Sequence, residues 1–315
     1  MKIVVLDGNT VNNGDLSWAP FERLGEFEVY PRSSKAEILQ RAKGADAILI
    51  NKAPISRETL SNLPELKYIG ILATGYNTVD TVAARERSIP VCNAAGYASE
   101  SVAQHVFALL LELTNHVALH DEDVKRGGWT NSPDWTYQRK PMMELWGKTM
   151  GIIGLGRIGQ TTARVAQGFG MKVIAHNRSP KDVAGVEMKS LKEVFAESDV
   201  ISLHCPLTAE NKEFINAEKL ALMKSSAILI NTGRGPLIQE VDLASALNED
   251  KIRAAGLDVL HQEPPNIDNP LIHAKNCITT PHNAWGTREC RERLIQIAAE
   301  NLENFQKGNP TNVVN

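Results

Sequence analysis

Short apolar runs alternate with amphipathic segments along nearly the whole sequence, and this alternation limits the folds that the chain can adopt. The apolar runs, such as residues 2–6 and 47–50, are rich in Val, Ile and Leu and short enough for buried strands. The segments between them repeat apolar residues at spacings of three and four, which is typical of amphipathic helices. Strands that alternate with helices predict parallel sheets built from right-handed βαβ units. We therefore expect an α/β protein.

The predicted strands fall into two series, which indicates two sheets. The first series comprises residues 2–6, 27–30, 47–50, 68–72 and 90–92. The second series comprises residues 149–153, 172–176, 200–204, 227–231, 254–259 and 277–280. The length of 315 residues also suggests two domains, at roughly 100–200 residues per domain.

Helical patterns join the strands within each series and connect the two series. Between the strands we expect helices at residues 35–43, 57–63, 78–87, 158–168, 216–223 and 241–248. In the connecting segment, residues 99–126, Val102 and Val106 belong to an apolar pattern with spacings of three and four, which predicts one long helix. A last helix is expected at residues 287–307, before Gly308 and Pro310.

Charge and cysteine content exclude several classes of protein. The chain has 34 Lys and Arg against 37 Asp and Glu, so its net charge of −3 argues against a nucleic-acid partner. Its four cysteines are far apart and form no C-x-x-C pair, so we expect no metal site and no disulfide framework. No apolar stretch approaches the roughly 20 residues of a membrane span. We expect a cytoplasmic protein without a membrane partner.

The most specific motif is a glycine-rich turn between a predicted strand and a predicted helix. Gly154, Gly156 and Gly159 are spaced as G-x-G-x-x-G, with Arg157 and Ile158 between the last two glycines. In such a turn the glycines allow a tight bend and a close approach of a pyrophosphate to the backbone. The helix N-terminus then offers N–H groups to the phosphates. The motif predicts a dinucleotide site.

The residues expected to contact the ribose leave the choice between NAD and NADP open. In NAD sites an acidic residue about 20 positions after the turn accepts the ribose 2′-hydroxyl. Here the strand at residues 172–176 is followed by Asn177, Arg178 and Ser179 instead. Asn177 can still bond a hydroxyl, while Arg178 and Ser179 can hold a 2′-phosphate. We expect either NAD or NADP as the cofactor.

Three later strands are followed by residues that can carry chemistry. Arg234 lies between two glycines after residues 227–231, Glu263 precedes two prolines, and His282 follows the strand at residues 277–280. The ends of parallel strands face the crevice in which ligands bind. Arg can clamp a carboxylate through two N–H bonds, and His supported by a carboxylate can exchange a proton near neutral pH. The three residues are therefore candidate catalytic residues.

The order of these motifs resembles the D-isomer-specific 2-hydroxyacid dehydrogenases over essentially the whole chain. Five segments carry the resemblance: residues 73–80 (ATGYNTVD), 154–159, 231–235 (NTGRG), 256–265 (GLDVLHQEPP) and 280–282 (TPH). Within the family, residues 1–8, 14–18 and 73–77 are most similar to the glycerate dehydrogenases, or hydroxypyruvate reductases. Asn177 departs from the acidic residue of NAD-preferring members.

The resemblance implies a role for each matching residue. Arg234 would bind the 2-oxo acid, His282 would be the acid/base, and Glu263 would support His282. Backbone groups of Thr74, Gly75 and Tyr76 would bind the substrate carboxylate. The residues implied to line the cofactor, in addition to the glycine-rich turn, are Cys205, Pro206, Thr232, Gly233 and Asp258, the last of them facing the nicotinamide.

The motif order also implies how the two domains are connected. We expect two Rossmann-like domains with parallel sheets, the cofactor domain being inserted into the substrate-binding domain. The substrate-binding domain would comprise residues 1–97 and 286–315, and the NAD(P)-binding domain residues 98–285. Family resemblance further implies a homodimer, with residues 129–146 reaching the partner subunit.

The implied activity is hydride transfer between NAD(P) and a small anionic 2-oxo or 2-hydroxy acid, hydroxypyruvate and glycerate first, and also glyoxylate. D-lactate, branched-chain 2-hydroxyacids and 3-phosphoglycerate are alternative substrates. A different class of function is a dinucleotide-sensing binding protein that resembles the corepressor branch of the family. The complete set of Arg234, Glu263 and His282 favours the enzyme.

Overall fold

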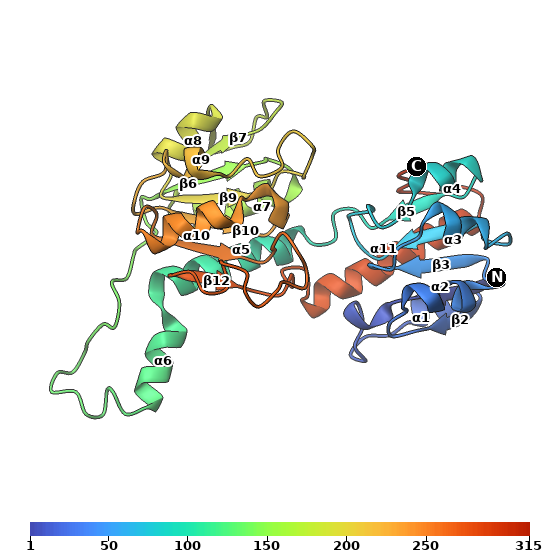
Figure 1. The fold of residues 1–315 in the computed structure, drawn as a ribbon, viewed down its shortest axis with the longest axis horizontal. Helices are drawn as coiled ribbons and strands as arrows, with labels where there is room; N and C mark the ends of the chain where they lie inside the picture. Colours follow the sequence, from blue (N-terminus) through green and yellow to red (C-terminus); the bar gives the residue numbers. More distant parts are fainter. The chain divides into compact units, whose positions relative to one another are not determined.

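The computed structural model describes all 315 residues, which form two compact units (Figure 1). Unit 1 comprises Met1–Ala98 and Trp285–Asn315, and unit 2 comprises Ser99–Ala284. The chain therefore leaves unit 1 after Ala98, completes unit 2 and returns to unit 1 at Trp285. Each boundary between units lies one residue from the position expected from the motif order.

Unit 1 is built on a five-stranded parallel sheet. Its strands are β1 (Lys2–Val5), β2 (Glu26–Val29), β3 (Ala47–Ile50), β4 (Tyr68–Ile71) and β5 (Val91–Asn93). They pair in the order β2-β1-β3-β4-β5, and every pairing is parallel. The sequence predicts all five strands, and no predicted strand end differs from the observed end by more than one residue.

Helices cover both faces of the sheet of unit 1 because alternate strand residues point to opposite faces. One face, with Ile48 and Ile50, is packed against α2 (Lys35–Ala42), α3 (Arg57–Ser61) and α4 (Thr81–Glu86). On the other face the ring of Tyr68 lies 4.9 Å from that of Phe305 in α11 (Arg288–Gln306). The short elements η1 (Gly8–Thr10) and α1 (Ala19–Glu22) follow β1.

Unit 2 is built on a seven-stranded parallel sheet. Its strands are β6 (Thr149–Ile153), β7 (Lys172–His176), β8 (Val186–Met188), β9 (Val200–Leu203), β10 (Ile228–Asn231), β11 (Ala254–Leu257) and β12 (Cys277–Thr279). They pair in the order β12-β11-β10-β9-β6-β7-β8. The sequence analysis missed β8 and the helix after it, α8 (Leu191–Glu197). The signal for α8 was the capping box formed by Ser190 and Glu193.

The sheet of unit 2 is also covered on both faces (Figure 1). Ile152 packs with residues of α5 (Ser99–Asn115) and α7 (Arg157–Gly168). The next residue, Ile153, packs on the opposite face with residues of α8, α9 (Ala217–Leu220) and α10 (Glu240–Asn248). The short helix η2 (Gly235–Leu237) follows β10. Unit 2 is thus a three-layer α/β sandwich, as the alternation predicts.

The predicted long helix at residues 99–126 is wrong, because two helices occupy this segment. α5 ends at Asn115, and α6 (Val117–Lys125) begins after a bend of 55°. His116 between them has a left-handed backbone, with φ of 53°, which an α-helix cannot continue. The Glu112 carboxylate accepts the backbone N–H of Ala118 at 3.3 Å, which stabilises the new start.

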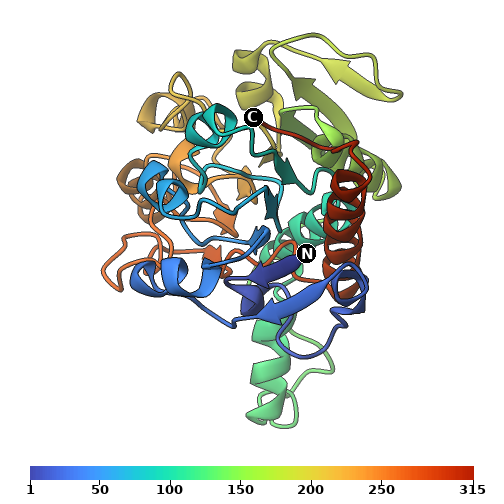
Figure 2. The same cartoon turned by 90° about the vertical axis from the view of Figure 1, so that its right-hand side faces the viewer.

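We call α6 and the chain that follows it, residues 117–147, the arm. In both views the arm projects away from the body of unit 2 (Figures 1 and 2). No single helix of the chain is long and apolar enough to cross a membrane; α5 and α6 meet the length and composition requirement only as a bent pair.

His204 follows β9 and is deeply enclosed, although part of the residue remains accessible. Its Nε2 lies 2.9 Å from the Ser202 hydroxyl, which is fully buried. Burial lowers the pKa of His204 from 6.5 to about 4. The imidazole is therefore neutral in the native state near pH 7 and resists protonation as the pH falls.

We expect Gly159→Ala in α7 to destabilise unit 2. A Cβ at Gly159 would collide with the carbonyl oxygen of Gly154, so strand and helix must move apart. We expect a loss of about 1–3 kcal/mol in the free energy of unfolding, measured by urea titration. Gly168→Ala in the same helix is the matched control, because its added Cβ meets no atom within 4 Å. The control should be neutral or stabilising by up to about 1 kcal/mol, and an equal loss in both variants would contradict the packing argument.

We also expect part of the pH dependence of stability to come from His204. Between pH 6.5 and about 4 the unfolded chain binds a proton at this residue and the native protein does not, so stability falls as the pH falls through that window. His204→Gln, which keeps a hydrogen-bonding side chain beside Ser202, should lose less stability between pH 7 and pH 4.5 than the wild type. The measurement is the urea midpoint at several pH values. The exposed His273→Gln variant should keep the wild-type slope, and parallel curves for all three proteins would refute the assignment.

Candidate active site

The three predicted catalytic residues follow three neighbouring strands of unit 2. Arg234 follows β10, Glu263 follows β11 and His282 follows β12, and β10, β11 and β12 are adjacent in the sheet. The pairings are parallel, with Asn231 opposite Leu257 and Leu257 opposite Thr279, so all three loops leave the same edge. The candidate active site lies at this carboxyl edge.

His282 and Glu263 form a direct pair. Nδ1 of His282 lies 2.6 Å from Oε2 of Glu263, and the other carboxylate oxygen accepts the backbone N–H of Leu260 at 3.3 Å. A carboxylate can only accept, so Nδ1 carries a proton and donates it. This bond selects the tautomer of the ring and leaves Nε2 as the atom that can exchange a proton with a substrate. The His282 side chain is 26% exposed, so it is accessible from solvent.

Asp258 is bonded to the segment that carries His282. The residue is 1% exposed. Its Oδ1 accepts the Thr280 hydroxyl at 2.7 Å and the backbone N–H of Asn283 at 2.9 Å, and its Oδ2 accepts the N–H of Ala284 at 2.9 Å. These three donors surround the carboxylate, and its expected place on the nicotinamide side stays a prediction. Asp258 therefore holds residues 280–284, which carry His282.

Arg234 lies on a turn that its neighbours organise. The side chain of Asn231 accepts the N–H of Gly233 at 3.0 Å and donates to the carbonyl of Arg234 at 2.9 Å. A Cβ at Gly235 would collide with the backbone of Leu260, so the turn packs tightly against the loop that leads to Glu263. Arg234 Nη1 donates to the carbonyl of Gly233 at 2.7 Å. The half-buried guanidinium keeps further donors for an anion.

The glycine-rich turn has the features that a dinucleotide needs. Gly154 has a φ of 100°, which favours glycine. Gly156 is the N-cap of α7, no side chain caps that helix, and a Cβ at Gly156 would meet no atom within 4 Å. Exposed Arg157 begins the helix and half-buried Ile158 follows it. The helix N-terminus thus faces open space and can bind a phosphate.

A further observation comes from Thr232, at the end of β10. The residue is 8% exposed and its hydroxyl has no hydrogen-bond partner. A buried polar atom without a partner is uncommon in folded proteins. Cys205 and Pro206 follow β9, and Gly154 lies directly against the backbone of residues 204 and 205. These residues therefore border the glycine-rich turn and fit the cofactor predicted from sequence.

The segment after β7 is hydrogen-bonded to the glycine-rich turn. The side chain of Asn177 accepts the N–H of Leu155 at 3.0 Å and donates to the carbonyl of Ser179 at 2.7 Å. Asn177 therefore connects this segment to the glycine-rich turn, a role that sequence analysis did not anticipate. Arg178 and Ser179 are exposed. No three His, Cys, Asp or Glu residues are arranged to hold a metal ion.

Unit 1 carries the predicted substrate loop at the carboxyl end of β4. Thr74 donates its hydroxyl to the carbonyl of Ala94 at 3.0 Å, and its own carbonyl accepts Asn93 Nδ2 at 2.6 Å. These bonds hold the loop formed by Thr74, Gly75 and Tyr76. Gly75 is half-buried, and Tyr76 is 45% exposed.

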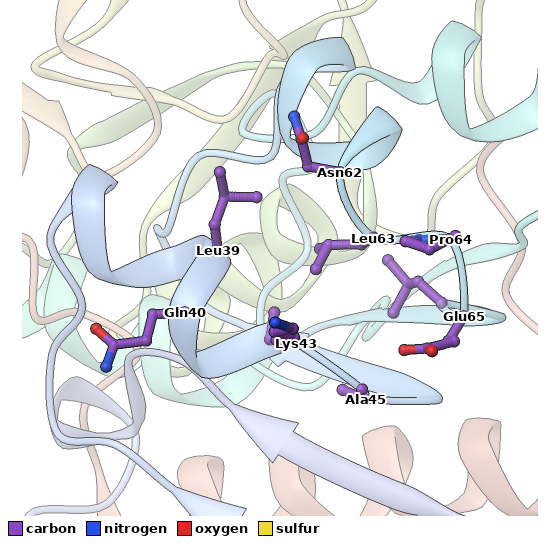
Figure 3. A pocket seen from close by; sticks show the side chains of 11 residues that line it. Leu39, Gln40, Lys43, Ala45, Asn62, Leu63, Pro64 and Glu65 are labelled. Carbon is purple, nitrogen blue, oxygen red and sulfur yellow. The ribbon is translucent and has the colours of Figure 1, made fainter.

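A pocket of about 600 Å³ lies elsewhere in unit 1 (Figure 3). Leu39 and Lys43 come from the end of α2 and the segment after it, and Leu63 and Glu65 come from the segment before β4. The pocket therefore lies toward the amino ends of β3 and β4, away from the loop at Thr74. It contains none of the predicted site residues.

Sequence analysis missed two polar residues of α5 that reach the candidate site. Ser101 donates its hydroxyl to the carbonyl of Ala284 at 2.6 Å, and Nε2 of His105 lies 2.9 Å from the Thr280 hydroxyl. The available signal was their spacing of four on a helix whose packed residues are otherwise mostly apolar. That signal does not reveal which loop the two side chains contact.

Comparison with known proteins agrees with this geometry. Residues 107–284 match the family described as D-isomer specific 2-hydroxyacid dehydrogenase, NAD binding domain. The whole chain is 49% identical to the full length of a hydroxypyruvate reductase from Blautia hydrogenotrophica. It is 40% identical to a glycerate dehydrogenase from Methylorubrum extorquens, over 99% of this chain and 98% of the relative.

Solved structures with the same fold include enzymes with bound cofactor. The structure of an acyclic imino acid reductase in complex with NADPH and D-arginine is 35% identical, with a TM-score of 0.88 and full coverage of both chains. The apo-structure of D-lactate dehydrogenase from Escherichia coli is 31% identical, with a TM-score of 0.83 and 98% coverage of both chains. Fold, motif order and full-length similarity agree, and the chain belongs to the D-isomer-specific 2-hydroxyacid dehydrogenase family.

Proposed function

We propose that this dehydrogenase interconverts hydroxypyruvate and D-glycerate, with glyoxylate as a further substrate. The observation that carries the proposal is the pair of His282 and Glu263, 2.6 Å apart, on the sheet edge that also carries Arg234 and the glycine-rich turn. The full-length similarity to a hydroxypyruvate reductase and a glycerate dehydrogenase supports the substrate.

His282 acts as the general acid during reduction and as the general base during oxidation. Nδ1 is committed to Glu263, so Nε2 gives a proton to the oxygen that develops from the keto group. The Glu263 carboxylate stabilises the ring when it is protonated and keeps its orientation. Oxidation of the hydroxy acid uses the same two groups in reverse.

Arg234 binds the substrate carboxylate and polarises the keto oxygen. Its guanidinium offers several donors in one plane, and only one of them is committed to Gly233. Backbone N–H groups of Thr74, Gly75 and Tyr76, in the loop after β4, are further candidate donors for a substrate carboxylate. In a chain with a net charge of −3, local donors such as these must attract the anionic substrate.

The glycine-rich turn and its neighbours hold the dinucleotide. Gly154, Gly156, Arg157, Ile158 and Gly159 would hold the pyrophosphate, and Arg178 and Ser179, which are exposed after β7, would hold the ribose. Thr232, Gly233, Cys205 and Pro206, which follow β9 and β10, would line the nicotinamide. When bound, the nicotinamide supplies or accepts the hydride. The matched NAD binding domain and the NADPH of the imino acid reductase support NAD or NADP alike.

We infer a homodimer that forms through the arm. Trp129, Trp135, Met142 and Trp146 of this segment are 50–86% exposed, and large apolar side chains that gather on one projection mark an interaction surface. A cytoplasmic location is supported by the four cysteines, none of which forms a disulfide.

We expect purified protein to oxidise NADH or NADPH with hydroxypyruvate, followed at 340 nm, faster than with glyoxylate, pyruvate or 3-phosphohydroxypyruvate. His282→Ala should lower kcat by a factor of about 10² or more, because the proton donor is removed. Exposed His273→Ala is the control and should keep the wild-type rate. Cofactor binding without turnover of any 2-oxo acid would favour a dinucleotide sensor, and an unchanged rate in His282→Ala would refute the acid/base role.

We expect Trp135→Ser combined with Met142→Ser to weaken the dimer, since both side chains belong to the exposed apolar surface of the arm. Light scattering after size-exclusion chromatography at micromolar protein should show a wild-type dimer and a shift toward monomer in the variant. Ile267→Ser removes an apolar side chain of similar exposure outside the arm and should leave the dimer intact. A monomeric wild type, or a variant that stays fully dimeric, would contradict the proposal.

A further inference from the structure

Residues 280–284, the segment that carries His282, need support from outside the segment. His282 has a φ of 51°, in the left-handed region that a residue with a side chain seldom adopts. Inside the segment, one bond joins the N–H of His282 to the carbonyl of Thr280 at 2.9 Å. A conformation of this kind persists only where the surroundings enforce it.

Two residues of α5 provide part of that support. Ser101 and His105 lie one turn apart on the same face of the helix. Ser101 is 4% exposed and bonds the carbonyl of Ala284, at the end of the segment. His105 bonds the hydroxyl of Thr280, at its beginning. α5 therefore contacts the segment on both sides of His282.

The direction of the hydrogen bonds follows from the number of protons available. The Asp258 carboxylate already accepts two backbone N–H groups, and Oδ1 lies 2.7 Å from the Thr280 hydroxyl. A threonine hydroxyl has one proton, and it is used in donating to Asp258. At 2.9 Å, Nε2 of His105 must then donate to the Thr280 oxygen. The result is a directed chain from His105 through Thr280 to Asp258.

His105 also lies close to the charge at the end of this chain. Its Nε2 is 3.4 Å from Oδ1 of Asp258, and its side chain is 20% exposed. An imidazole N–H at this distance stabilises the buried carboxylate by its dipole and strengthens the bonds that Asp258 accepts. Loss of His105 therefore removes a donor from Thr280 and a favourable electrostatic interaction from Asp258.

We propose that His105 is a positioning residue for His282. It acts through Thr280 and Asp258 to hold residues 280–284 in the conformation that pairs His282 with Glu263. The inference rests on the acid/base role proposed for His282, but the segment that it concerns can be observed without activity.

The test compares His105→Phe, which keeps a flat ring and removes the donor, with His105→Gln, which keeps an N–H donor. We expect His105→Phe to lower kcat for hydroxypyruvate roughly 10- to 100-fold, the effect of a misplaced catalytic group. The KM for the dinucleotide should stay within about twofold, since the glycine-rich turn is untouched. His105→Gln should recover much of the lost kcat, and exposed His273→Phe should match the wild type.

Double variants separate positioning from a general structural effect. In the His282→Ala background, His105→Phe should cause no further loss of kcat, because His105 acts only through His282. Thr280→Val should lower kcat as His105→Phe does, and the two together should cost no more than one alone. A further tenfold loss in the His282→Ala background, or full additivity with Thr280→Val, would overturn the proposal.

Hydrogen exchange tests the segment directly and independently of activity. The N–H groups of Asn283 and Ala284 bond Asp258, so peptides that contain them should exchange faster in His105→Phe than in the wild type. Peptides from β6 should exchange equally in both proteins. Unchanged exchange at residues 283 and 284 would overturn the positioning role. Faster exchange in His105→Phe, together with a wild type that turns over no 2-oxo acid, would support the positioning role and refute the proposed enzymatic function.

Discussion

The structure of unit 2 depends on the parallel pairing of its seven strands. Parallel pairing places every strand-to-helix loop at one edge, so residues that are far apart in sequence meet there. The glycine-rich turn after β6 and the loops after β10, β11 and β12 all use this edge. The apolar strands of this sheet are buried on both faces, so the hydrophobic core lies apart from the loops at the edge.

A single buried carboxylate organises the reactive part of this edge. Asp258 directly follows β11 and accepts hydrogen bonds from Thr280, Asn283 and Ala284 after β12, so the loop of the neighbouring strand is bonded to it. A buried charge is tolerated only when it is well paired, and these bonds satisfy that requirement. They also allow His282 to keep an unfavourable backbone conformation beside Glu263. The same few hydrogen bonds thus pair a buried charge and hold the segment that carries His282.

Local patterns in the sequence were sufficient where the physical cause is local. Strand and helix periodicity, the glycine spacing and the polar residues after β10, β11 and β12 all follow from contacts within a few residues of each other. They predicted eleven of the twelve strands and marked Arg234, Glu263 and His282 as candidate residues, while the support of His282 by Glu263 was implied by the family resemblance. The prediction failed at two places: the left-handed His116 divides one predicted helix into α5 and α6, and β8, which the sequence analysis missed, pairs with β7.

The sequence by itself determined the α/β class, the family and the candidate site residues, because each depends on residue type and short-range spacing. Only the tertiary structure decided what those groups contact. Asp258 accepts hydrogen bonds from the His282 loop, Asn177 bonds the glycine-rich turn, and Ser101 and His105 reach this loop from α5. The reason is physical: a hydrogen bond depends on the distance and direction between two groups, and strand order and helix packing set both between residues that are far apart along the chain.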